Sequence, residues 1–536
     1  MPPRFIVAIL LLLFFLCACS GKDETGRTHQ PEAAGKGARQ IHLPGGDWGL
    51  PTPFTFYPRG PGYIHLSFVY DTLIWKDHES MIPWLAESWE SSPDGLRWTF
   101  HLRPEIKWQD GQPATANDVC FTFKYLQRHP VEWFDLESVS TVEARDDRTV
   151  VFRLTKPYAP FLGQVAGNVP IIPEHIWKDV KDPRSATNLN RVVGSGPYRL
   201  VRYDKAQGAY AYEANPNFFL GAPHMEGLYF VPVGDPVAAL ERGLVDEARI
   251  PASLLSQFQN REGMWVLPGP SYWVLTLRFN CSRYPFSKKA VRQALAYAVD
   301  REALIKQAVP GGLRGAKPGS PGFLPPDSDW FDPKLQNVYP YDCPRAESLL
   351  KSAGIEDRNG DQVCEAADGS PMQFTLITTS EYLREAEALQ LMLRKIGVVL
   401  QPKTMDVKSL DALLREGRFD LALTGHGGLG ADPSVITGFG AAQRSQSLGA
   451  PSNPAYLALA ERLLASSDRR QRMELCRRMQ HLYADQLPAL PLYYPTWFSV
   501  HRSKVLAGWF YTAQGGVGIG IPSPYNKLVF IQGDPP

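Results

Sequence analysis

An alternation of strand-like and helix-like segments runs through FTLITTSEYLREAEALQLMLRKIGVVLQPKTMDVKSLDALLREGRFDLALTG, residues 374–425. Apolar runs open this stretch, divide it at residues 398–400 and close it at residues 419–425. The first segment between them repeats apolar residues at helical spacing and stops at a glycine: Leu389, Met392, Leu393, Ile396 and Gly397. A strand-helix-strand-helix-strand order predicts an α/β unit whose sheet is partly parallel.

The chain before this stretch has a different pattern. Residues 64–123 and 194–233 show short apolar or alternating runs broken by turn residues, which favours strands. After residue 284 helical periodicity strengthens, and we expect Ser287 and Asp300 to cap two successive helices. No period of 20 to 50 residues recurs, so a solenoid or propeller is excluded. The sequence predicts a β-rich first half and an α/β second half.

Size and charge limit the classes of protein that fit. A chain of 536 residues exceeds the roughly 250–300 residues at which single cores stop growing, so we expect more than one lobe. Hydrophobic residues make up 44% and charged residues 21%, which excludes a disordered chain. Lys and Arg number 56 against 55 Asp and Glu, a net charge of +1, so we expect no nucleic-acid partner.

The N-terminal sequence predicts an export signal. Arg4 precedes an apolar run over residues 5–16, which is shorter than the roughly 20 residues of a membrane-spanning helix. The sequence Leu-Cys-Ala-Cys that ends it resembles the bacterial lipobox, so we expect a lipoprotein signal peptide at residues 1–18 and acylation of Cys19. The alternative is a plain secretory signal. Residues 19–39 are polar and lack periodicity, which predicts a flexible tether.

Seven cysteines are present, and the five after Cys19 contain no CxxC spacing. We therefore expect neither a zinc site nor a redox motif. Cys343 and Cys364 are the nearest pair, and a bridge between them is the alternative to free thiols.

No catalytic motif such as HExxH, GxSxG or a P-loop occurs. Ser195 stands between two glycines without the rest of a nucleophile elbow, so we expect a turn there. The glycine-rich residues 515–520 have no strand before them and no helix after them, which favours a surface loop over a phosphate site.

One segment is similar to a calcium-binding loop. Its oxygen-bearing residues fall at loop positions 1, 3, 5, 9 and 12, with Val363 at position 7: Asp357, Asn359, Asp361, Glu365 and Asp368. Position 6 holds Gln362 where glycine is usual, and the last ligand is Asp instead of Glu. Calcium is therefore one interpretation and a plain acidic turn is the other. No other cofactor is expected.

Five blocks of sequence, in order, resemble one family: VYDTLIW, the stretch at residues 81–123, GSGPYRLVRY, PFSKKAVRQALAYAVDREALI and YDCPRAESLLKSAG. This family is the extracytoplasmic solute-binding proteins, family 5, of bacterial peptide and nickel ABC importers. The resemblance covers residues 64–509. It implies an α/β fold of the periplasmic-binding-protein type II, with three lobes and a hinged ligand cleft. Lobe I would comprise residues 40–70, 190–268 and 489–536, lobe II residues 71–189, and lobe III residues 269–488. The hinge would lie near residues 268 and 489.

The same resemblance implies a function. The protein would be a monomeric receptor, anchored by lipid in the periplasm or at the cell surface, that hands a solute to ABC-transporter permease subunits without doing chemistry. A peptide is the first ligand expected, because peptide binders are the commonest members. A nickel or metal-chelate ligand is the closest alternative. An exported hydrolase and a sensor or adhesion receptor without a permease are rivals from other classes.

The segment that carries ligand specificity in this family is here LALTGHGGLGADPSV, residues 421–435. Peptide binders resemble G-W-x-x-D there, whereas His426 stands at the Trp and Leu429 at the Asp, so the expected counter-charge for an ammonium group is missing. Nickel binders resemble D-P-H, and here Asp432 is followed by Pro433 and Ser434. The resemblance implies a ligand site at Trp273, His426, Gly427, Gly428, Leu429, Asp432, Tyr494 and Trp497.

Each of these candidates has a structural alternative. His426 either meets a ligand or is a satisfied histidine at a strand end. Asp432 either contacts ligand or caps a turn before Pro433. Trp273, Tyr494 and Trp497 either line the cleft or belong to the core.

Overall fold

The computed structural model describes residues 39–57, 61–131, 134, 136–430, 432–440, 453–512 and 523–533. The predicted signal peptide, Cys19 and the tether up to residue 38 lie outside the described residues, as do residues 515–520. Within the described part, no helix combines the length and the hydropathy needed to cross a bilayer.

A mixed four-stranded sheet is built from both ends of the first half of the chain. Its strands are β1 (Gln40–Pro44), β8 (Tyr198–Asp204), β9 (Ala209–Ala214) and β10 (Gly227–Val231), in the order β1-β10-β9-β8. β1 runs parallel to β10, and its Ile41 and Leu43 are fully buried while the residues between them are not. Helices α1 (Gly62–Val69) and α13 (Lys527–Gln532) contribute to the same hydrophobic core.

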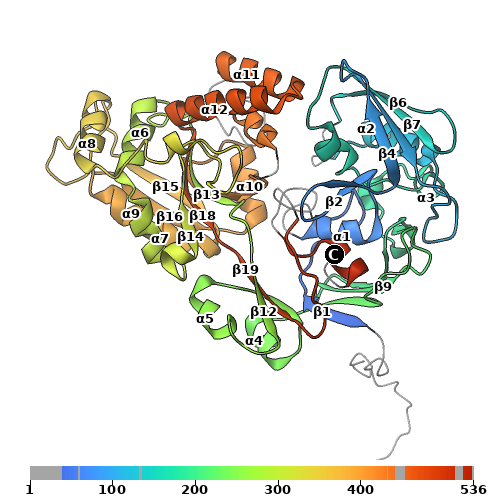
Figure 1. Cartoon of the computed structure of the whole chain (residues 1–536). Coiled ribbons are helices and arrows are strands. Elements are labelled where there is room, and N and C mark those ends of the chain that lie inside the picture. Colours follow the sequence, from blue (N-terminus) through green and yellow to red (C-terminus); the bar gives the residue numbers. More distant parts are fainter. Residues whose placement is uncertain are drawn as a thin grey trace, which may run out of the picture. The chain divides into compact units, whose positions relative to one another are not determined.

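An antiparallel sheet with one covering helix follows. Its strands are β4 (Ala86–Ser91), β5 (Arg97–Leu102), β6 (Val139–Ala144) and β7 (Thr149–Leu154), in the order β4-β5-β7-β6. Helix α2 (Ala116–Arg128) packs on it, and a capping box between Thr115 and Asp118 fixes the helix start. The ribbon β2 (Ile74–Lys76) and β3 (Met81–Pro83) precedes this sheet, and α3 (Glu174–Trp177) follows it. Figure 1 shows these elements on the right, apart from the six-stranded sheet.

The six-stranded sheet of the second half has the order β14-β18-β13-β17-β15-β16. Its strands are β13 (Val274–Phe279), β14 (Ala316–Pro318), β15 (Gln373–Thr378), β16 (Val399–Thr404), β17 (Leu421–His426) and β18 (Ala489–Pro495). β15 is parallel to β16 and β17, and β13 is antiparallel to β17 and β18. The partly parallel arrangement predicted for residues 374–425 is therefore confirmed.

Helices cover both faces of this sheet. The helices are α6 (Lys289–Ala298), α7 (Arg301–Ala308), α8 (Cys343–Ser352), α9 (Leu383–Arg394), α10 (Val407–Arg415), α11 (Pro454–Ala465) and α12 (Arg469–Gln486). Leu376 of β15 joins the core of α6 to α9, and its neighbour Ile377 joins the core of α10. Because successive side chains of a strand point to opposite faces, α10 covers the face that α9 does not.

The two predicted helix caps differ in outcome. Asp300 caps α7, because its side chain accepts a hydrogen bond from the amide of Ala303 at 3.0 Å. The prediction for Ser287 was wrong, since α6 begins at Lys289 and has Lys288 at its N-cap. The amides of Ser287 and Lys288 bond to Arg283 and Pro285, so the preceding residues form turns of their own.

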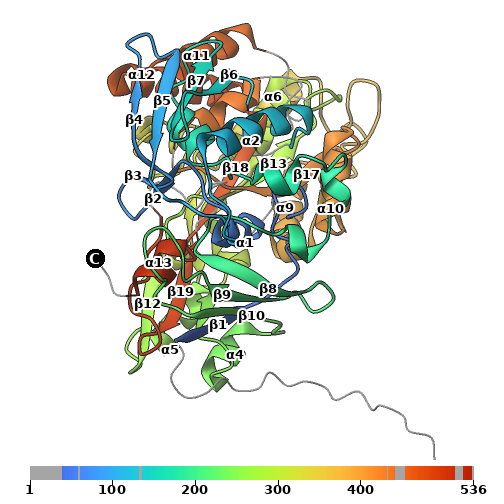
Figure 2. The same ribbon diagram turned by 90° about the vertical axis from the view of Figure 1, so that its right-hand side faces the viewer.

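A three-stranded sheet stands where the chain passes between its two halves. Its strands are β11 (Glu247–Ile250), β12 (Met264–Pro268) and β19 (Phe498–Arg502), in the order β11-β19-β12, with α4 (Pro236–Arg242) and α5 (Leu255–Phe258) beside them (Figures 1 and 2). The predicted division into three lobes remains a prediction, but the boundary proposed at residue 489 disagrees with the sheets. β18 pairs with β13 in the six-stranded sheet, so the second crossing follows Pro495.

A buried ion pair ties the last helix to the first half of the chain. Lys527 Nζ lies 2.6 Å from Asp71 Oδ1, and both side chains are fully buried. The ammonium group also lies 3.9 Å and 4.5 Å from the ring centroids of Trp75 and Trp84. Asp71 accepts further hydrogen bonds from Trp84 Nε1 and Ser195 Oγ at 2.6 and 2.8 Å. Such a fully bonded pair tolerates burial because every charge has partners.

Candidate functional site

The two crossings of the chain meet beside Trp497. The amide of Gly269, just after β12, donates a 2.7 Å hydrogen bond to the carbonyl of Trp497, which lies between β18 and β19. Arg249 is the exposed residue of the otherwise buried strand β11. Its guanidinium carbon lies 4.3 Å from the centroid of the Trp497 ring, a cation-π stack.

Acidic and aromatic side chains of the six-stranded half approach this stack. Burial raises the pKa of Glu381, while its hydrogen bond with Tyr382 and the positive charge of Arg249 lower it. Burial also raises the pKa of Tyr382, and the neighbouring Trp273 side chain lowers it. Glu381 and Tyr382 belong to a short 3-10 helix, η7 (Ser380–Tyr382), just before α9. A base from one half of the chain is therefore electrostatically coupled to an acid from the other half.

A second acid lies close behind Glu381. Tyr493 of β18 donates a 2.7 Å hydrogen bond to Glu385 of α9. Burial raises the pKa of Glu385, the bond from Tyr493 lowers it, and Glu381 raises it further. Because Glu385 already accepts the hydrogen bond from Tyr493, we assign it a structural role beside Glu381.

Trp273 reaches the site because a glycine leaves room for it. A Cβ atom on Gly425 of β17 would lie 2.3 Å from the Trp273 indole, closer than real side chains approach. Gly425 therefore lets the half-buried indole lie across the end of β17. Of the predicted ligand residues, Trp497 therefore lies against Arg249, and Trp273 lies near Tyr382.

The predicted specificity segment starts at the end of β17. His426 is half-buried, and its ring lies 5.8 Å from that of Phe323 in an edge-on contact. Gly427 and Gly428 follow, and Gly428 has a φ of +81°, a left-handed conformation that favours glycine. The ligand role of these three residues stays a prediction.

Two predicted ligand residues are core residues. Leu429 is only 1% exposed and packs in the cluster that contains Val274 and Phe323. Tyr494 is fully buried, and its hydroxyl donates to the carbonyls of Phe323 and Leu324 at 3.0 Å. The resemblance had placed Leu429 at the Asp of the peptide-binder motif and Tyr494 where the chain leaves the third lobe, and a ligand role for these buried side chains stays a prediction.

Asp432 is engaged by the protein itself. Its Oδ1 lies 2.7 Å from Arg472 Nη2 and accepts the amide of Ser434 at 2.8 Å. The hydrogen bond from the Ser434 amide caps a turn, which was the structural alternative predicted for Asp432. Burial lowers the pKa of Lys76 on β2, and this shift is opposed by the charge of Asp432. Asp432 is therefore not a spare counter-charge for a ligand ammonium group.

The predicted calcium loop brings only part of its residues together. Asp357, Asp361 and Glu365 have carboxylate oxygens within 4.8 Å of one another. Gln362, at the position where glycine is usual, adopts a left-handed φ of +67°. Asp368 instead accepts bonds from the amide and hydroxyl of Ser370, and Asn359 bonds to Asp361. Calcium binding by this loop stays a prediction.

Ser195 and three of the cysteines after Cys19 are bonded or buried. Ser195 Oγ donates to Asp71, as expected for a turn residue and not for a nucleophile. The cysteines after Cys19 are free thiols, so Cys343 and Cys364 form no bridge. Burial raises the pKa of Cys120 and Cys281, and that of Cys476 to about 12, which suppresses the reactive thiolate.

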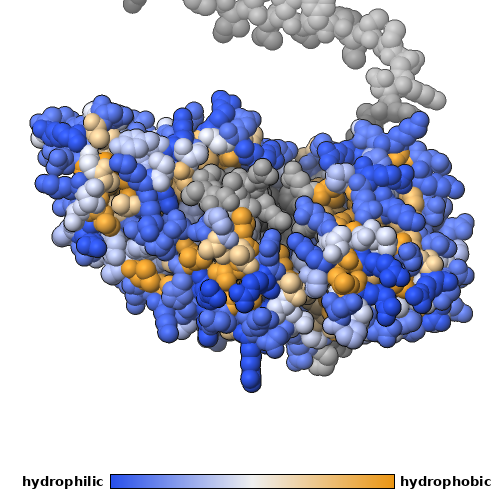
Figure 3. All heavy atoms as spheres, turned by 90° about the horizontal axis from the view of Figure 1, so that it is seen from above, coloured by the Kyte–Doolittle hydropathy of each residue, from blue (hydrophilic) through white to orange (hydrophobic). Residues whose placement is uncertain are grey.

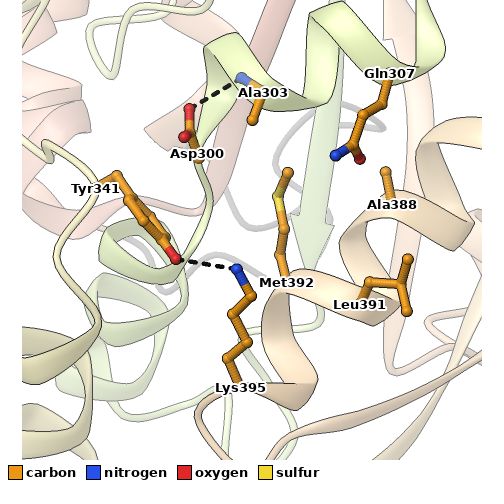
Figure 4. A pocket seen from close by; sticks show the side chains of 8 residues that line it. All are labelled: Asp300, Ala303, Gln307, Tyr341, Ala388, Leu391, Met392 and Lys395. Carbon is orange, nitrogen blue, oxygen red and sulfur yellow. Dashed lines mark hydrogen bonds between the residues drawn. The ribbon is translucent and has the colours of Figure 1, made fainter.

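A pocket of about 290 Å³ lies elsewhere, between α7 and α9. Figure 4 shows Met392 and Leu391 of α9 beside Gln307 of α7, with Tyr341 and Lys395 joined by a 3.4 Å hydrogen bond. None of the predicted ligand residues lines it.

A family comparison covers most of the described chain. The family described as "Bacterial extracellular solute-binding proteins, family 5 Middle" matches residues 80–445. The chain belongs to this family. The predicted resemblance is therefore confirmed, and this family 5 protein is extracytoplasmic in class.

Individual relatives agree with that assignment. The dipeptide-binding protein of Escherichia coli K12 is 29% identical over 458 residues, covering 79% of this chain and 83% of the relative. The oligopeptide-binding protein AppA of Bacillus subtilis is 26% identical over 513 residues, covering 91% and 92%. The structure of NikZ from Campylobacter jejuni in complex with Ni(L-His) has a TM-score of 0.78 at 26% identity, covering 92% of this chain and 99% of that chain. The predicted α/β fold of a periplasmic binding protein is confirmed.

Arg249, Glu381 and Tyr382 were not predicted from the sequence. Arg249 lies in a short strand and Glu381 in a single turn, and neither belongs to a recognisable motif. The one local signal is the arginine itself, the exposed residue of the otherwise buried strand EARI. Only the tertiary structure brings the two residues into electrostatic contact.

Proposed function

We propose that this family 5 protein is the receptor of an ABC importer for small peptides, which it binds without chemical change and presents to the permease subunits. The observation that carries the proposal is the Arg249 guanidinium stacked on Trp497, together with Glu381 from the other half of the chain, whose pKa the charge of Arg249 lowers. A peptide carries one ammonium and one carboxylate group, and these two residues offer the complementary charges. The relatives named for peptide binding supply independent support.

Glu381 would supply the negative charge for a ligand ammonium group, which the specificity segment at residues 421–435 lacks. Burying an ammonium group without a counter-charge is costly. Leu429 cannot provide the charge, and Asp432 is held by Arg472. Glu381 is the acid that stands beside Arg249 and the aromatic side chains, so we assign the amino group of the ligand to it.

Metal-chelate binding is the second candidate. It is favoured by the similarity to NikZ, whose structure contains Ni(L-His). His426 would then be the metal-facing residue, since imidazole is a common ligand of nickel. Histidine in a nickel chelate also has an amino group and a carboxylate group. The charges of Arg249 and Glu381 therefore do not by themselves distinguish a peptide from a chelate.

The proposal also includes a lipid anchor at Cys19 and binding of the ligand without catalysis. An acyl-modified Cys19 would hold the protein at the membrane surface, and more than one acyl chain is needed for stable anchoring. Binding without catalysis is supported by Ser195, which is bonded to Asp71 inside the core. We expect the protein to act as a monomer.

The proposal is tested by what the protein carries. The protein is purified without denaturation, and its bound small molecules and metals are identified by mass spectrometry and elemental analysis. Stoichiometric peptides confirm the peptide receptor. Stoichiometric nickel with a chelator, and no peptide, replaces it with the second candidate. Turnover of added peptides would contradict a purely binding role.

A further inference from the structure

The guanidinium of Arg249 is held in place but not neutralised at close range. It stacks on Trp497 at 4.3 Å, and it forms no ion pair within 4.0 Å with any residue in the described ranges. Stacking uses the face of the guanidinium and leaves its N–H groups directed outward in the plane of the fork. That fork fits the two oxygens of a carboxylate.

The ring beneath Arg249 brings a further donor. Trp497 Nε1 is buried and has no hydrogen-bond partner among the residues that the structure describes. Buried donors are nearly always satisfied in native proteins, so an orphaned one calls for an acceptor. The backbone of Trp497 accepts a hydrogen bond from the amide of Gly269, and its indole stacks on Arg249. A cation and an unsatisfied donor on the same stack both select an acceptor-rich, negatively charged group.

The acids around the stack limit how much negative charge can enter. Glu247 is fully buried on β11, and its oxygens accept bonds from Ser499 and Tyr525. Its charge and that of Glu381 are both coupled to Arg249, and burial raises the pKa of each. Two acids near one base favour a monoanion over a dianion such as a phosphate, because each added negative charge is repelled.

We propose that Arg249, stacked on Trp497, binds the carboxylate of the ligand, so that the ligand must carry a free carboxylate and lies with that end toward the three-stranded sheet. This inference rests on the proposed function and deepens it. It makes Arg249 a specificity-determining residue and sets the direction of a peptide, with its amino end toward Glu381.

The test compares two probes that differ in one group. Full-length protein in detergent, freed of bound molecules, is titrated calorimetrically with tri-alanine and with tri-alanine amide, which lacks the carboxylate. We expect the amide to bind about 10- to 100-fold more weakly, the range of a charge-assisted hydrogen bond. Arg249→Met should weaken tri-alanine by a similar factor and should leave the amide unchanged. Arg249→Lys, which keeps the charge without the planar fork, should recover part of the preference.

Arg261→Met is the matched control. Arg261 also lies over an aromatic ring, that of Phe258 at 5.7 Å, but it is paired with Glu241 at 3.3 Å. This variant should keep the wild-type preference. Equal binding of the two probes by the wild type, or an Arg249→Met protein that still prefers tri-alanine, overturns the inference while leaving peptide binding intact.

If the proposed peptide-binding function is wrong, neither tri-alanine nor its amide binds. If neither peptide binds, the same proteins are titrated with the nickel complexes of histidine and of histamine, which lacks the carboxylate. A preference for the histidine complex that Arg249→Met removes supports the inference for a chelate ligand. Equal affinity for the two nickel complexes overturns it.

Discussion

Arg472 of α12 holds Asp432 at 2.7 Å, with side chains only 10% and 24% exposed. Asp432 was a predicted ligand residue, and this ion pair gives it a structural role instead. The guanidinium of Arg472 also lies 5.5 Å from the Trp330 ring, which fixes it further. The segment after β17 is thereby fastened to the helices that pack behind it.

The first prediction concerns this pair. Asp432→Asn keeps an oxygen for the amide of Ser434 but removes the charge that Arg472 pairs with. We expect the free energy of unfolding to fall by about 1.5–3 kcal/mol, the value of a hydrogen bond to a charged group. Ligand affinity should not change. Urea unfolding and ligand titration measure the two quantities. Arg469→Met, at a 63% exposed side chain, should stay within about 0.5 kcal/mol. A stable Asp432→Asn protein that no longer binds ligand would restore Asp432 to the site.

The second prediction concerns Lys527 and Asp71. Lys527→Met leaves the Asp71 carboxylate fully buried without its counter-charge, which costs about 3–5 kcal/mol. The double variant Lys527→Met with Asp71→Asn should lose less than the sum of the single losses, because no unpaired charge remains. Lys504→Met, at an exposed position, serves as the control. Additive losses in urea unfolding would show that the two side chains do not stabilise each other.

The third prediction is a loss of stability in mild acid. Burial lowers the pKa of His501 on β19 to about 3, below the value of 6.5 for an exposed histidine. Between these two pH values the unfolded chain binds a proton that the folded chain refuses, so stability falls as the pH falls below 6.5. From pH 7 to pH 5 the loss should be about 2 kcal/mol for this histidine.

His501→Phe isolates that contribution. The ring stacks on Trp509 at 4.1 Å, so an aromatic replacement keeps the packing. Its urea midpoint should fall less between pH 7 and pH 5 than that of the wild type. His78→Phe, at a 44% exposed side chain, should keep the wild-type slope. Glu247 acts in the opposite direction, since a raised pKa stabilises the protein at low pH, and it is common to all three proteins. Identical slopes in wild type and His501→Phe would refute a neutral buried His501.

The fourth prediction concerns the acidic loop. If Asp357, Asp361 and Glu365 hold calcium, the metal at 100 times its Kd should add about 2.7 kcal/mol to the free energy of unfolding. Asp361→Ala should abolish this gain. Asp368→Ala should keep it, because Asp368 is bonded to Ser370. Thermal unfolding with calcium and with chelator gives the comparison, and an unchanged midpoint would leave the plain acidic turn as the interpretation.

Local periodicity predicted the elements of residues 374–425, because each strand and helix there carries its own apolar repeat. It could not predict that β14 and β18 complete the sheet. β18 begins 85 residues after the end of β16, and its pairing with β13 is set by tertiary packing. For the same reason the crossing was predicted six residues too early, at the start of β18.

The candidate site was predicted in part. Trp273 and Trp497 were predicted because they stand where the chain enters and leaves the third lobe, and their ligand role stays a prediction. Tyr494 was predicted on the same basis and Leu429 from its place at the Asp of the peptide-binder motif, yet the packing around Phe323 buries both. Arg249 and Glu381 are separated by more than a hundred residues and belong to no motif, so their coupling follows only from the folded chain.

The bond between Lys527 and Asp71 spans 456 positions of the chain. At the roughly 5–20 residues per second of ribosomal synthesis, Asp71 exists for about 20 to 90 s before its partner is made. The hydrophobic core that is translated first is therefore completed last, because it contains both Ile41 of β1 and Phe530 of α13, whereas the six-stranded half is one continuous segment and has all its strands earlier. A chain that ends before Lys527 keeps its second half intact and leaves a bare carboxylate in the core of the first.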